Sequence, residues 1–230
     1  MKFDPAKFPS EIPRQWIDGA NRGILLMRER LVDKIEYRNI SHFEICCRWV
    51  EIYLQAHIRR ALNLIEGGLA ELHANRPIIA ALCARALIED GAMVWHFQRR
   101  VNVFLDDKDT NGLESFVFSR ALQSRDTKHI EEYGEEYRAT NILTSIDQMT
   151  KQHPNVRRWY DELSEVCHPN QDGVLWHCAD IDGESSAAQF DDRVEAESAL
   201  RFLLFGALTF LGEDTAMRRL EQRMKEMCGR

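Results

Sequence analysis

The chain has 230 residues, enough to bury a hydrophobic core without disulfides or metals to hold it together. Its 44% hydrophobic and 29% charged residues are ordinary for a globular protein and exclude an intrinsically disordered chain. The formal net charge of −7 weighs against broad contact with nucleic acid or anionic membranes. Only 12 glycines and 6 prolines are present, and because strand-rich folds need many turns, this scarcity favours an all-α fold.

The predicted secondary structure is almost entirely helical. Three prolines within residues 1–13 indicate an extended N-terminal arm of a single helical domain, and residues 168–186 should form an irregular or β-like excursion. Apolar periodicity and polar turn residues elsewhere define a bundle of about seven helices. The predicted helices span residues 14–38, 42–66, 77–105, 113–123, 127–152, 155–167 and 191–227.

Local signals mark the ends of the second helix and the core of the last one. Ser41 and Glu44 have the spacing of a capping box, in which each side chain bonds the other residue's backbone N–H. Gly67 and Gly68 should break or kink this helix, because glycine lowers helix stability. Residues 202–211 form the longest apolar run of the chain and should lie in the core.

No segment has the features of a secretion signal or a membrane span. The N-terminus lacks a basic stretch followed by an apolar run, and residues 202–211 are too few for a spanning helix of about 20 residues. The six cysteines form no C-x-x-C pair and lie mostly among apolar neighbours. We therefore predict a cytoplasmic protein with reduced thiols and no membrane partner.

A polar stripe runs along the helix predicted at residues 77–105, which is otherwise apolar on nearly every side. Arg85, Glu89, His96 and Arg100 follow one another at intervals of 4, 7 and 4 residues and therefore share one face. The stripe either reaches water along one edge or lines a polar cavity, where buried charges must be paired. Arg85 precedes Glu89, the weaker order for an ion pair within one helix, which favours partners elsewhere for both.

A second polar group is predicted at the end of the helix at residues 155–167. Tyr160, Ser164 and His168 recur at every fourth position and share one face. His168 and Asn170 either cap the helix and the turn after it, or His168 acts as a general acid or base. The second alternative rests on the titration of histidine near neutrality.

Together the two groups define a candidate site. Arg85 would hold an anion such as phosphate or carboxylate, whose geometry its planar guanidinium matches, while His168 would move a proton. No cofactor is implied, because glycine-rich phosphate loops and the G-x-S-x-G and H-E-x-x-H motifs are absent from the sequence. The candidate catalytic residues are His168, Glu89 and Tyr160, and the candidate ligand-binding residues are Arg85, Ser164, Asn170 and His177.

Residue types found in zinc sites also occur in this region. Cys167 and His168 are neighbours, as are His177 and Cys178. Neighbouring residues on a helix point about 100° apart, so the two ligands of one pair diverge. Structural zinc sites have more regular ligand spacing, and we predict no metal site.

The stretches at residues 85–89 and 160–170 resemble segments of uncharacterised bacterial all-helical proteins, some of which are similar to HEPN-type helical bundles. The resemblance implies a helical bundle, and the HEPN class includes ribonucleases of toxin–antitoxin and phage-defence systems. HEPN nucleases carry an Arg followed by four to six residues and a His on a late helix. Three residues separate Arg125 from His129 and nine separate Arg158 from His168, so neither pair matches and no active-site residue is carried over.

Three functions are compatible with these features. Met217, Leu220, Met224 and Met227 have heptad-like spacing and favour a module that binds a partner or forms a homodimer, although packing within one chain explains them equally. The polar residues favour an enzyme or binding protein for a small anionic molecule. The resemblance favours a ribonuclease, against which the net charge and the missing motif argue.

Overall fold

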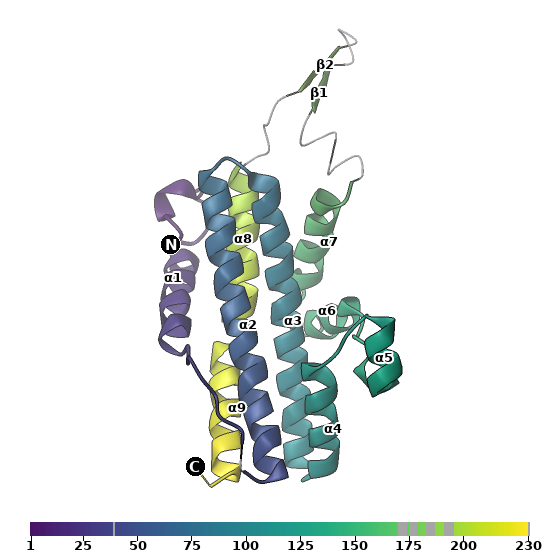
Figure 1. Ribbon diagram of the computed structural model, residues 1–230. Coiled ribbons are helices and arrows are strands. Elements are labelled where there is room, and N and C mark those ends of the chain that lie inside the picture. Colours follow the sequence, from purple (N-terminus) through teal and green to yellow (C-terminus); the bar gives the residue numbers. More distant parts are fainter. Residues whose placement is uncertain (39, 170–173, 175–178, 183–186, 191–195, 230) are drawn as a thin grey trace.

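The fold is an all-α bundle built around two long antiparallel helices, α2 (His42–His73) and α3 (Pro77–Asp106) (Figure 1). It is taken from a computed structural model that describes residues 1–38, 40–169, 174, 179–182, 187–190 and 196–229. The predicted capping box starts α2, since the Ser41 backbone N–H donates to Glu44 and the Glu44 N–H donates to Ser41. The predicted all-α fold class is confirmed.

The remaining elements surround this central pair. α8 packs along α3 and α2, α1 covers α8 and α2, and α4, α6 and α7 follow one another along the other side of α3. A two-stranded antiparallel hairpin lies beyond the end of the bundle where α7 ends, with Ala179 opposite Phe190. The elements are α1 (Arg14–Glu29), α4 (Thr110–Ala121), α5 (Thr127–Tyr133), α6 (Ile142–Thr150), α7 (Asn155–Cys167), β1 (Ala179–Asp182), β2 (Ala187–Phe190), α8 (Ala196–Leu211) and α9 (Asp214–Met227), with 3-10 turns at Pro5–Lys7 and Glu135–Tyr137.

Close packing of α8 explains the glycines of its neighbours and corrects one prediction. α2 continues through Gly67 and Gly68 without a break. A Cβ on Gly68 would lie 2.7 Å from a methyl carbon of Leu203, so glycine at this position makes room for α8. On α8 itself, a Cβ on Gly206 would lie 2.6 Å from the Ala84 carbonyl oxygen of α3. The apolar run at residues 202–211 thus lies in the core as predicted, with Leu203, Leu204 and Phe210 fully buried.

The described residues contain nine α-helices, more than the seven predicted, because two predicted helices are each divided. The stretch at 127–152 breaks at Gly134, which has a φ of 114°. It resumes at α6, where the Asn141 side chain accepts a hydrogen bond from the Leu143 N–H. The last helix divides into α8 and α9 at Gly212, and the first ends at Glu29 rather than at residue 38.

The N-terminal arm is docked on the bundle, in contrast to the extended arm predicted. Phe3 is fully buried, and its backbone N–H and C=O both bond the Asn21 side chain of α1, at 2.8 and 2.9 Å. At the other end of the chain, the sulfur atoms of Cys47 of α2 and Cys228 after α9 face each other, but their Cα atoms are 7.4 Å apart, farther than a disulfide spans. The reduced state of the thiols stays a prediction. Among the described helices, none has both the length and the apolar character needed to cross a membrane.

Candidate functional site

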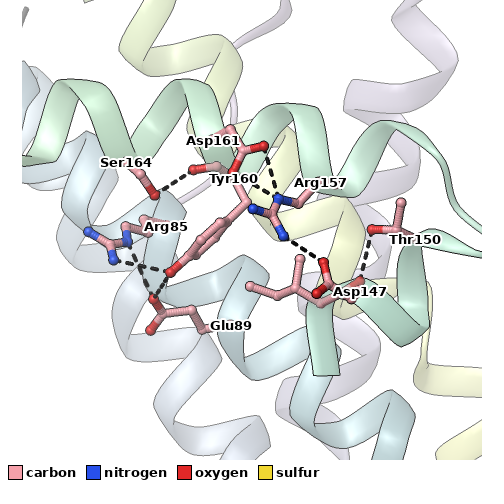
Figure 2. A network of polar contacts seen from close by, with 9 residues as sticks. Arg85, Glu89, Asp147, Thr150, Arg157, Tyr160, Asp161 and Ser164 are labelled. Carbon is pink, nitrogen blue, oxygen red and sulfur yellow. Dashed lines mark hydrogen bonds and ion pairs between the residues drawn. The ribbon is translucent and has the colours of Figure 1, made fainter. Parts of the chain in front are cut away.

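The first half of the polar stripe meets α7 in a closed network of three side chains (Figure 2). Arg85 Nη2 donates to the Tyr160 hydroxyl at 3.1 Å, and that hydroxyl donates to Glu89 Oε1 at 3.2 Å. Arg85 Nε lies 3.3 Å from the same Glu89 oxygen, which completes a triangle. We call this group, Arg85, Glu89 and Tyr160, the α3–α7 tie.

The α3–α7 tie has the charge balance of a structural contact. One cation and one anion face each other, and the Tyr160 hydroxyl uses both its proton and a lone pair within the network. Burial alone would lower the pKa of the Arg85 guanidinium, but the Tyr160 hydrogen bond and the Glu89 charge raise that pKa overall. Arg85 therefore stays charged, and its charge is already matched by Glu89.

Further polar contacts hold α7 in place beside the tie. Arg157 donates to Asp161 at 2.9 Å on α7 and to Asp147 of α6 at 2.5 Å, so it joins the two helices (Figure 2). The Ser164 hydroxyl donates to the Tyr160 carbonyl at 2.8 Å, within the same helix. Ser164 is thus occupied by its own backbone, and its predicted role in ligand binding stays a prediction.

The predicted catalytic histidine makes no hydrogen bond or ion pair with the tie. His168 is exposed at the C-terminal cap of α7, where its backbone N–H donates to the Ser164 carbonyl at 3.0 Å. Within the described part of the chain, its imidazole makes no hydrogen bond or ion pair. Asn170 and His177, both predicted to bind a ligand, lie outside the described residues, as does Cys178 of the rejected zinc pattern.

The second half of the stripe faces different neighbours. His96 lies among the residues that line a small cavity where α4 and α6 approach α3, and Arg100 lies over the Phe104 and Phe116 rings at 5.0 and 5.9 Å. Arg120 of α4 approaches the same Phe116 ring at 5.6 Å from its centroid. Two guanidinium groups therefore share one aromatic ring beside a histidine.

No carboxylate among the described residues pairs with any of these three basic groups. Arg120 donates to Gln123 at 3.5 Å and to the Thr140 hydroxyl, both of them neutral. Its Nε is buried without a hydrogen-bond partner. We call this cavity, with His96, Arg120, Tyr53 and Ser145 on its wall, the Arg120 pocket.

The electrostatics of the Arg120 pocket follow from that lack of acids. Burial, and then the charges of Arg120 and Arg100, lower the pKa of His96, so its ring is neutral at pH 7. Burial and then the repulsion from Arg100 also lower the pKa of Arg120, despite an opposing contribution of Tyr53. Burial is the larger cause of both shifts, and no carboxylate opposes either of them.

The hydroxyl groups of two largely buried residues complete the wall of the pocket. Tyr53 is 7% exposed and Ser145 is 6% exposed, and neither hydroxyl has a hydrogen-bond partner among the residues that the structure describes. Burial and then Asp90 raise the pKa of Tyr53, so the phenol keeps its proton and can donate it. Asp90 itself is paired with Arg60 at 2.9 Å. Sequence reasoning identified His96 and Arg100 but missed Arg120, Tyr53 and Ser145, which no spacing pattern links to the stripe.

Two other predictions concern metals and oligomers. Met217, Leu220 and Met224 are buried inside the chain and pack on α2 and α3, whereas Met227, the last residue of the predicted stripe, is exposed. The predicted homodimer stays a prediction. The residues that the structure describes contain no cluster of three or more His, Cys, Asp or Glu side chains able to hold a metal ion.

The comparisons with known proteins return no match: no protein-family model, no curated protein and no solved structure is similar to this chain at a significant level.

Proposed function

We propose that this protein binds a small molecule through an anionic head group, which enters the Arg120 pocket. The observation that carries the proposal is Arg120 itself, a half-buried guanidinium with no carboxylate partner among the described residues. Burying a cation is costly unless an opposite charge compensates it. A bound anion would supply that charge.

The donors around the cavity suit an oxyanion. Arg120 lines the cavity, and guanidinium groups bind carboxylate and phosphate oxygens through paired N–H donors. The hydroxyls of Tyr53 and Ser145 and the ring of His96 offer further donors on the same wall. Arg100 adds positive charge at the side of the pocket.

The size of the cavity limits what it encloses. Its volume is about 30 Å³, room for roughly two water-sized groups. A phosphate or carboxylate terminus would therefore enter the pocket only with its outer oxygens, and the rest of the ligand would lie at the mouth. Ligand binding, rather than catalysis, is what these contacts support.

Sulfate is the probe that tests this proposal, because its charge does not change near neutral pH. We expect Arg120→Gln to weaken sulfate binding by about tenfold, the equivalent of one charge-assisted hydrogen bond. The matched control is Arg85→Gln, which removes another half-buried arginine whose charge is already paired with Glu89. It should leave the sulfate affinity within about twofold. Calorimetric titration at constant ionic strength removes the effect of general screening.

A second variant guards against loss of structure in Arg120→Gln. Tyr53→Phe removes only a hydroxyl that has no hydrogen-bond partner among the described residues, so the fold should keep its stability. We expect it to weaken sulfate binding by about threefold. Equal sulfate affinities in the wild type, Arg120→Gln and Tyr53→Phe proteins would refute the proposal.

A further inference from the structure

A second cavity lies on another side of the bundle, where the start of α7 meets the junction of α8 and α9. Its volume is about 380 Å³, within the range of small-molecule sites. Most of its wall is apolar and comes from Met149, Val156, Trp159 and Leu208. The Trp159 ring is held in place by stacking on Phe205, with ring centroids 4.5 Å apart.

One acidic side chain is buried in this wall. Glu213, between α8 and α9, is 8% exposed and lines the cavity. It precedes the first residue of α9, yet its side chain makes no capping hydrogen bond. Within the described part of the chain, its carboxylate has no hydrogen bond and no ion pair.

The neighbouring polar groups do not compensate this carboxylate. The Thr209 hydroxyl, also on the wall, donates to the Phe205 carbonyl at 2.8 Å. Arg99 is the nearby cation, but it donates to Gln152 at 3.1 Å and lies over the Trp95 ring at 4.8 Å. His153 stands at the exposed rim of the cavity.

The pKa of Glu213 shows which is stronger, the effect of burial or the attraction of Arg99. Burial raises the pKa of the Glu213 carboxyl to about 7, although the Arg99 charge acts to lower it. The attraction of Arg99 therefore stabilises the ionised carboxylate less than the loss of hydration destabilises it. A further cation in the cavity would stabilise the ionised carboxylate.

We propose that this cavity is a second binding site, for a primary ammonium group carried on an apolar stem. The ammonium would pair with the unpartnered Glu213 carboxylate, and the stem would lie against Trp159 and Leu208. A metal ion does not fit, because a single carboxylate supplies too few ligands. The site is independent of the Arg120 pocket and uses none of its residues.

Butylammonium chloride tests the site, with 1-pentanol as a neutral probe of similar length. Binding is followed through the carboxyl ¹³C signal of Glu213, assigned by its loss in Glu213→Gln, and by calorimetry. We expect saturable butylammonium binding that weakens by about tenfold in Glu213→Gln, whereas pentanol binding changes by less than about twofold.

The same experiment distinguishes a free amine from a lysine side chain. N-acetyl-lysine N-methylamide carries the same ammonium on a stem attached to a peptide unit, and its binding would identify lysine peptides as the source. Butylammonium binding without binding of the lysine derivative would identify small amines. Equal butylammonium affinity in the wild type and Glu213→Gln proteins, or no saturable binding of either amine, would overturn the proposal.

Discussion

The two halves of the polar stripe on α3 differ in how their charges are compensated. In the α3–α7 tie, Arg85 forms an ion pair with Glu89, and the Tyr160 hydroxyl accepts a hydrogen bond from Arg85 and donates one to Glu89. In the Arg120 pocket, His96 meets two arginines and no described acid. Residues that look alike in sequence thus serve as architecture in one half and as a candidate binding site in the other.

This difference shows that the partners of a buried polar residue, rather than its polarity, indicate whether the residue is structural or part of a binding site. A polar group inside a helical bundle is explained once its partners are found, and in the tie the charge of Arg85 is offset by Glu89. In a basic cluster without an acid, the free-energy cost of burying the positive charges is not compensated within the protein. The predictions below test whether the closed half contributes stability and whether the unpaired groups respond to charge.

The largest effect is expected in the closed half. Tyr160 is 4% exposed, so Tyr160→Ala should lower the free energy of unfolding by about 3–5 kcal/mol through loss of packing. Tyr160→Phe keeps the ring but removes the hydroxyl between Arg85 and Glu89, and should cost only about 1 kcal/mol. Urea unfolding measures both. A cost for Tyr160→Phe as large as that for Tyr160→Ala would contradict this division between packing and hydrogen bonding.

A somewhat smaller effect is expected from the unpaired carboxylate of Glu213. Its pKa is about 7 in the folded protein, against 4.5 as the usual value. The folded state therefore holds this proton more tightly than the unfolded state, and stability falls as pH rises from 4.5 through 7. The total is at most about 3–4 kcal/mol. Glu213→Gln should be more stable than the wild type at pH 8 and equally stable at pH 4, as measured by urea unfolding at both pH values.

Helix positions were predictable wherever a local signal decided them. The Ser41–Glu44 capping box and the apolar run at 202–211 need only neighbours in sequence, and both are confirmed. Gly68 was misread because its reason is the Leu203 side chain of a distant helix. The helix predicted at residues 127–152 instead divides at Gly134, whose φ of 114° lies outside the helical range.

The candidate site was predictable only in part for a similar reason. Helical spacing placed Arg85, Glu89, His96 and Arg100 on one face, which the geometry of a single helix determines. Which of them are paired depends on Tyr160 and Arg120, which approach from α7 and α4. His168 shares a helix face with Tyr160, but it lies at the exposed end of α7.

The most direct test of the Arg120 pocket is an NMR titration of His96 with and without sulfate. The pKa of His96 lies below its usual 6.5 because of burial and two arginines. A bound anion favours the imidazolium, so saturating sulfate should raise this pKa by about one unit, and sulfate affinity should rise as pH falls. The signal is assigned by its loss in His96→Gln, and the shift should be absent in Arg120→Gln. A His96 pKa that is unchanged by sulfate would contradict the proposed anion site.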